Sequence, residues 1–128
     1  MIEQKSFTPY PEHMLPKGFK YPESYLKLSK STDTIIPDKE LGFPWGFDSY
    51  GTQGAELSYK YRNSYLSDAF NLIPFAHCYE WGAYFDGSDC SGDPRVIVID
   101  RNELPFHDFR NNFDDWLADA INIAWYYG

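Results

Sequence analysis

The sequence RVIVID at residues 95–100 decides the fold, because it is the clearest strand in the chain. Four consecutive β-branched residues stand at its centre, and turn-forming residues come before it. A continuous apolar run of this kind is typical of a strand that is buried on both faces. We therefore expect residues 95–100 to form a central strand of a sheet.

Two more strand-like segments lie upstream of this one. The run LIPFA at residues 72–76 contains Pro74, which indicates an edge strand or the start of a strand. The run WGAYF at residues 81–85 follows after a short turn. Residues 86–94, which lead to the central strand, are dense in turn formers. The three segments predict strands joined by turns.

The last part of the chain, residues 112–125, is predicted to be an amphipathic helix laid on the sheet. Its apolar residues recur at helical spacing, and Asn111 or Asn112 is available as its N-cap. Asp114 and Asp115 stand in its first turn, where the helix dipole favours negative charge. The apolar positions are Phe113, Trp116, Leu117, Ala120, Ile121 and Ala124.

The first half of the chain has weaker patterns. Residues 21–30 are expected to form a helix, because Pro22 and Glu23 suit a helix start. With a size of 128 residues, the chain is expected to be a single domain, residues 1–128, whose order of helix, strands and helix predicts an α+β fold. The other segments are residues 1–20, an irregular lead-in; 34–54, irregular with strand fragments at 34–36 and 43–47; and 56–70, either strand or helix.

The chain is acidic and rich in aromatic residues. Nineteen acidic residues against eleven Lys and Arg give a formal net charge of −8, and there are ten Phe, eleven Tyr and four Trp. Such a field repels phosphate backbones, so we do not expect nucleic-acid binding. It would steer a basic protein partner, and Tyr and Trp are enriched at interfaces. The alternative is that the charge serves solubility and the rings fill the core.

The sequence indicates neither a membrane segment nor an export signal. No apolar run approaches the roughly 18 residues of a membrane span, and the N-terminus has no apolar signal core. Cys78 and Cys90 are too few for the disulfide framework of a small secreted domain. We therefore expect a cytoplasmic protein that binds no membrane and has no disulfide between these cysteines.

No metal site or cofactor is expected. The loop at residues 86–93 holds three Asp and two Ser, but its sixth position is Ser91, where an EF-hand loop requires Gly. The His and Cys residues show none of the paired spacings that zinc sites use.

No catalytic pattern is present either. The sequence has no Gly-x-Ser-x-Gly elbow and no Gly-rich phosphate loop. The adjacent His77 and Cys78 would point to opposite faces of a strand, so they would not form a catalytic pair. We therefore expect a binding protein, and an unrecognised small enzyme is the alternative.

Several short motifs follow one another in a definite order. After a helix that contains Tyr25 and Leu26 come LIPFA at residues 72–76, WGAYFDG at 81–87, VIVID at 96–100 and FDDWL at 113–117. This order, over roughly residues 15–124, resembles the SUKH superfamily, the Smi/Knr-like domain. In that family an Ile-Pro-Phe-Ala strand, an aromatic–Asp strand, a Val-Val-x-Asp strand and a Phe-x-x-Phe-Leu helix occur in the same order. The chain departs from it at residues 31–33, where Ser-Thr-Asp replaces the frequent Asn-Gly-Gly.

The resemblance implies a twisted, mainly antiparallel sheet flanked by helices. Most bacterial members look like immunity proteins, which bind and neutralise toxins that are commonly nucleases, and eukaryotic-type members look like regulatory scaffolds. The resemblance therefore implies a basic toxin domain as the partner, with a regulatory or scaffold interaction module as the alternative. It supplies no catalytic residues.

We expect the partner-binding surface around two turns of one hairpin, where carboxylates and a ring could share an edge of the sheet. Reversing Asp86 and Asp89 to Lys is expected to slow association, to flatten its salt dependence and to leave folding nearly intact. The alternative is that these aspartates shape a tight turn. The candidate residues are Glu80, Trp81, Asp86, Asp89 and Asp93, and the remaining acidic surface includes Asp108, Asp114, Asp115 and Asp119.

Overall fold

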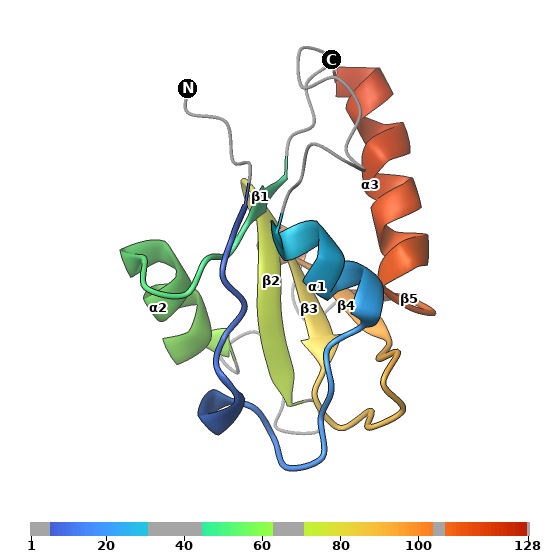
Figure 1. Cartoon of the computed structure of the whole chain (residues 1–128). Helices are drawn as coiled ribbons and strands as arrows, with labels where there is room; N and C mark the ends of the chain where they lie inside the picture. Colours follow the sequence, from blue (N-terminus) through green and yellow to red (C-terminus); the bar gives the residue numbers. More distant parts are fainter. Residues whose placement is uncertain (1–5, 31–44, 63–70, 104–106, 128) are drawn as a thin grey trace.

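The computed structural model in Figure 1 shows a five-stranded antiparallel sheet flanked by helices. It describes residues 6–30, 45–62, 71–103 and 107–127. The strands lie in chain order across the sheet, β1-β2-β3-β4-β5, and each pairs antiparallel with the next. This arrangement confirms the predicted α+β fold. The elements are η1 (Glu12–Met14), α1 (Glu23–Lys30), β1 (Gly46–Phe47), α2 (Gln53–Lys60), β2 (Leu72–Cys78), β3 (Trp81–Asp86), β4 (Val96–Asp100), η5 (Arg101–Glu103), β5 (His107–Arg110) and α3 (Phe113–Tyr127).

Strand β4 is buried on both faces, as its sequence predicts. Val96 and Val98 belong to the main core, whereas Ile97 and Ile99 belong to a smaller cluster on the other face of the sheet. β4 lies between β3 and β5, so it is an interior strand, although β3 is the middle one.

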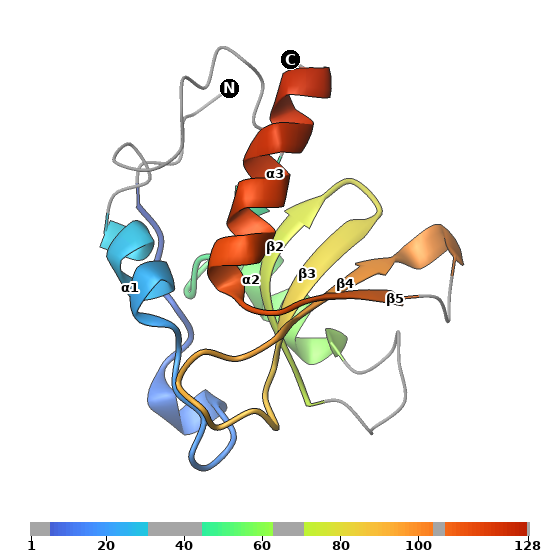
Figure 2. The ribbon, with the colours of Figure 1, turned by 90° about the vertical axis from the view of Figure 1, so that its right-hand side faces the viewer.

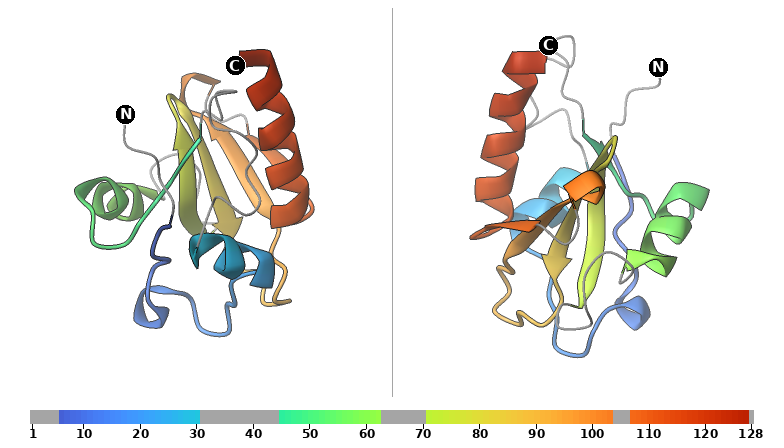
Figure 3. Two further views of the ribbon diagram at one scale, coloured as in Figure 1. Left: turned by 45° about the horizontal axis from the view of Figure 1, so that its top comes forward. Right: turned by 180° about the vertical axis from the view of Figure 1, so that it is seen from behind.

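The two faces of the sheet are covered by different helices. Helices α1 and α3 lie on one face, and α2 lies on the other side, next to β2 (Figures 1 and 3). Under α1 and α3 the core consists largely of rings: the centroid of Tyr25 lies 5.0 Å from Phe85, 5.4 Å from Phe113 and 5.9 Å from Phe75. Much of the aromatic content therefore serves packing.

Helix α3 begins where the sequence predicts. The side chain of Asn112 caps it, since its Oδ1 accepts a hydrogen bond from the backbone N–H of Asp115 at 2.9 Å. Trp116 and Leu117 are buried on the side that faces the sheet. Helix α1 is also confirmed, beginning at Glu23 directly after Pro22.

The N-terminal segment is irregular apart from η1, yet it forms part of the core. The ring of Phe7 stacks on that of Phe47 at 4.6 Å. The hydroxyl of Tyr10 donates to the carbonyl of Ala55 at 2.7 Å. Because these contacts are to β1 and α2, the segment ties together elements from other parts of the chain.

Residues 56–70, for which the sequence allowed either a strand or a helix, begin inside helix α2. Thr52 caps it by accepting a hydrogen bond from the N–H of Ala55 at 3.2 Å. Of the residues predicted as a strand at 43–47, the described part forms only the two-residue β1. The fragment at 34–36 and residues 63–70 lie outside the described residues.

Pro74 lies in β2, which is an interior strand by its place in the sheet. β1 pairs only with Ala76 and His77, so Pro74 lies beyond the end of that partner. The pairing of β2 with β3 shifts register between Pro74 and Ala76. The proline therefore occupies a position where a missing N–H is tolerated.

Candidate partner-binding surface

The structure separates the five predicted binding residues into two groups at opposite ends of β3 (Figure 2). Glu80 lies in the turn between β2 and β3, and Trp81 is the first residue of β3. Asp86 is the last residue of β3, and Asp89 and Asp93 belong to the connection between β3 and β4. A six-residue strand separates the groups by about 16 Å, at about 3.3 Å per residue. The prediction that all five share one edge is therefore wrong, because successive turns of an antiparallel sheet lie at alternate ends.

Asp86 is a structural residue and is only 2% exposed. Its Oδ2 accepts hydrogen bonds from Nη2 of Arg95 at 2.7 Å and from Nε at 3.2 Å. Its Oδ1 accepts from the backbone N–H and the hydroxyl of Ser88 at 3.0 and 2.5 Å. Burial by itself would raise the pKa of Asp86, but the hydrogen bonds from Ser88 and Arg95 outweigh it and hold the pKa below its usual value. A buried carboxylate with these partners is not available to another protein.

Asp89 and Asp93 also shape the connection between β3 and β4. Asp89 accepts from the backbone N–H groups of Ser91 and Arg95, both at 3.1 Å. Its pKa is lowered mainly by the side chain of Ser91, with further contributions from these two backbone groups. Asp93 accepts from the side-chain amide of Asn112 at 3.3 Å. The alternative interpretation, in which the aspartates shape a turn, is the one that these contacts support.

The β2–β3 turn has the most unusual backbone in the described chain. Tyr79 is its first residue and has φ = +55°, the only positive φ of a described residue other than glycine. Two-residue hairpin turns normally place Gly, Asn or Asp at such positions, and a bulky residue there is strained. The side chain gains little from packing in return, because it is 82% exposed.

Arg101 fixes this turn from the neighbouring end of β4. Its Nη2 donates to the carbonyl of Tyr79 at 2.7 Å, and its Nε donates to the carbonyl of Glu80 at 3.3 Å. Its backbone N–H donates to the same Glu80 carbonyl at 3.0 Å. The turn is therefore held in one conformation before any partner arrives.

These elements form what we call the hairpin-tip surface. Trp81 is 42% exposed and pairs with Asp100 across the sheet, so the end of β4 lies beside the β2–β3 turn. The surface is acidic, because three carboxylates accompany one guanidinium that is engaged with backbone carbonyls. It also carries two exposed aromatic rings. It comprises Tyr79, Glu80, Trp81, Asp100, Arg101 and Glu103. The sequence analysis missed Tyr79, although a two-residue gap between two predicted strands was a signal for it.

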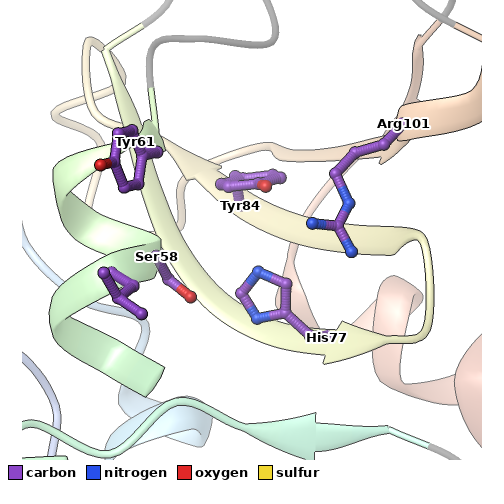
Figure 4. A pocket seen from close by; sticks show the side chains of 6 residues that line it. Ser58, Tyr61, His77, Tyr84 and Arg101 are labelled. Atoms are coloured by element: carbon purple, nitrogen blue, oxygen red, sulfur yellow. The ribbon is translucent and has the colours of Figure 1, made fainter. Parts of the chain in front are cut away.

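A pocket of about 240 Å³ lies beside this surface, between α2 and the sheet (Figure 4). In the part of the chain that the structure describes, Leu57, Ser58 and Tyr61 line it from α2, His77 and Tyr84 from the sheet, and Arg101 from η5. We call it the α2 pocket.

The α2 pocket contains a histidine that is oriented by a carboxylate. Nδ1 of His77 lies 3.0 Å from Oδ1 of Asp48. This pair corresponds to two of the three members of a nucleophilic triad. No hydrogen bond joins His77 to the hydroxyl of Ser58, which also lines the pocket. The described residues therefore contain a general-base geometry without an engaged nucleophile.

Among the described residues, no three His, Cys, Asp or Glu side chains gather as a metal ion would require. Both described cysteines are free, and burial raises the pKa of the Cys78 thiol, with a further contribution from Glu80. No helix within the described ranges is long and apolar enough to cross a membrane.

The outer edge of the sheet at β5 is capped by its own side chains. Asp108 accepts from the backbone N–H of Phe109 at 2.9 Å, and Nη1 of Arg110 donates to the Phe109 carbonyl at 2.8 Å. Arg110 also donates to Asp108 at 2.9 Å and to Asp119 of α3 at 2.5 Å. Side chains that occupy the backbone groups of an edge strand hinder pairing with another chain. This edge is therefore poorly suited to receive a partner's strand.

Compared with protein-family models, with curated proteins and with solved structures, the chain has no match in any of the three. The function is therefore inferred from the geometry of the hairpin-tip surface and from the order of the sequence motifs.

Proposed function

We propose that the protein is an immunity-type binding protein, similar to SUKH-superfamily members, that neutralises a basic toxin domain by docking it on the hairpin-tip surface. The observation that carries the proposal is Tyr79, a strained and almost fully exposed aromatic residue on a fixed turn. Backbone strain persists where function maintains it, and exposed Tyr, Trp and Arg are the side chains that dominate interface energetics.

The charge of the surface supports a basic partner. Glu80 and Glu103 are exposed, and the whole chain carries a formal charge of −8. A nuclease presents cationic groups to its substrate, so an acidic inhibitor associates faster with that groove and discriminates against acidic proteins. The fixed turn adds to this, because a surface that is already ordered loses less entropy on binding.

Co-expression with the toxin domain encoded next to the gene of this chain tests the proposal. We expect the unmodified chain to restore growth, and the double variant Tyr79→Ala, Trp81→Ala to fail. The loss of two aromatic anchors should weaken binding by at least about 30-fold, since one such residue contributes about 2 kcal/mol or more. The matched control is Tyr50→Ala, which removes another exposed ring, 41% exposed, away from the hairpin tip.

Two results would contradict the proposal in different ways. If the double variant protects as well as the unmodified chain, the hairpin-tip surface is not the interface. If the unmodified chain protects against no neighbouring toxin domain, the immunity function is wrong, and the regulatory or scaffold module becomes the better interpretation.

A further inference from the structure

A second pocket lies at the opposite end of β2 from the hairpin-tip surface. It has a volume of about 220 Å³ and lies where the end of α2, the segment around η1 and the residue before β2 meet. In Figure 1, η1 lies directly below α2. We call this site the η1 pocket. The described residues that line it are 13–16, Tyr59, Arg62 and Asn71, and none of them carries a carboxylate.

Two contacts fix the guanidinium of Arg62 in this pocket. Its central carbon lies 3.8 Å from the centroid of the Tyr59 ring, so the two planar groups are in contact. Its Nη1 donates to the carbonyl of Tyr59 at 2.7 Å. The hydroxyl of Tyr59 donates to the carbonyl of Met14 at 2.5 Å, which ties the supporting ring to the facing segment. Arg62 is therefore oriented before any ligand arrives.

One edge of this guanidinium is left for a ligand. Its contact with the Tyr59 carbonyl caps the last turn of α2 but uses Nη1 alone. Nε and Nη2 have no hydrogen-bond partner within the described residues, and no ion pair between described residues includes Arg62. The Nε–Nη2 edge presents two parallel donors, an arrangement that pairs with a carboxylate. Arg95 uses the same two atoms in this protein to hold Asp86.

The neighbouring carboxylates do not occupy Arg62. Glu12 in η1 and Glu56 in α2 are exposed to solvent, and neither lines the pocket. Asp86 is close in the sheet, as the register partner of Leu72, but it is paired with Arg95. One guanidinium without an ion pair matches one negative charge. A carboxylate carries one, whereas a phosphate group on an organic molecule carries about 1.5 to 2.

The rest of the pocket suits a small organic acid. The side-chain amide of Asn71 has two N–H donors, and the imidazole of His13 has one in its neutral form. Met14 and Leu15 form an apolar wall that packs against the core. The volume corresponds to about seven water molecules, which leaves room for a carboxylate with a short carbon chain.

We propose that the η1 pocket binds a small carboxylate. Nε and Nη2 of Arg62 contact the carboxylate oxygens, and the side-chain amide of Asn71 supplies a further donor. The site does not depend on the proposed toxin partner, because it lies at the other end of β2 from the hairpin-tip surface.

Titration of the ¹⁵N-labelled protein with sodium acetate at pH 7, with the ionic strength held constant, tests the site. We expect saturable shifts of the Nε–H signal of Arg62 and of the side-chain amide of Asn71. Shifts that rise linearly with acetate, and no more than with sodium chloride, would overturn the proposal. Sodium phosphate is titrated in parallel, and saturation at lower concentrations of phosphate than of acetate would overturn the assignment to a carboxylate.

Two variants locate the binding, each with a matched control. Arg62→Gln should raise the dissociation constant for acetate at least tenfold, whereas Lys17→Gln, which removes an equal charge next to the pocket, should leave it within about twofold.

Asn71→Asp places a negative charge in the pocket at an exposed position, where folding tolerates it, and should abolish saturation. Asn102→Asp makes the same change at an exposed position outside the pocket and should have no effect. Unchanged affinity in Arg62→Gln and Asn71→Asp, or an equal loss in the two controls, would show that acetate binds elsewhere.

Discussion

Replacing Trp116 by alanine is expected to lower the free energy of unfolding by about 3–5 kcal/mol, the usual effect of truncating a fully packed aromatic residue. Trp116 is 3% exposed, and it contacts rings from the sheet, from the residue before β1 and from its own helix. Its centroid lies 4.8 Å from Phe75, 5.2 Å from Trp45 and 5.7 Å from Phe113. Sheet and helix both border the resulting cavity, so neither can collapse to fill it.

Urea denaturation followed by circular dichroism measures this effect. The matched control is Trp81→Ala, the same substitution at an exposed position, for which we expect a loss of about 1 kcal/mol or less. Equal losses at Trp116 and Trp81 would contradict the packing of α3 against the sheet.

The charge-reversing substitution Asp86→Lys is expected to lower the free energy of unfolding by at least about 3 kcal/mol. The substitution removes the acceptor for Arg95 and Ser88 and places an ammonium group next to a guanidinium in a buried position. This corrects the expectation that reversal at this position leaves folding nearly intact. Asp93→Lys is the control, since it makes the same charge change at an exposed position of the same loop, and its effect should stay within about 1 kcal/mol.

The lowered pKa of Asp86 adds a pH dependence to this prediction. Because the folded-state pKa lies below the unfolded value of about 3.9, the stabilisation is present above that pH and is lost as the pH falls through the folded value. Asp86→Asn should therefore lose less stability than the unmodified chain between pH 5 and pH 2, as measured by urea denaturation. Identical acid sensitivity of the two proteins would contradict the role of the Asp86–Arg95 pair.

The strands and the last helix could be predicted because each has a strong local pattern. Residues 96–99 are β-branched, and α3 combines helical spacing with an Asn cap. Helix α2 gave no such pattern, since Ala55 is its only buried residue and the alternation of Leu57, Tyr59 and Tyr61 resembles a strand. The cap at Thr52 was the one local signal for a helix there.

The binding surface could be predicted only in part. Glu80 and Trp81 lie on the hairpin-tip surface, but neighbours in sequence such as Trp81 and Asp86 are separated by the length of β3. The buried pair of Asp86 with Arg95 and the positive φ of Tyr79 depend on how the strands pair, which no single segment encodes. The α2 pocket is assembled from segments far apart in the chain, so no local motif could indicate it.

The affinity of Tyr79→Gly for the cognate toxin domain, measured by calorimetry, tests most directly whether the strained turn is kept for binding. Glycine accepts the positive φ without strain, so the free energy of unfolding should stay unchanged or rise by up to about 1 kcal/mol. We predict that the dissociation constant rises at least tenfold although the fold is no less stable. An unchanged affinity for the toxin domain would contradict the account.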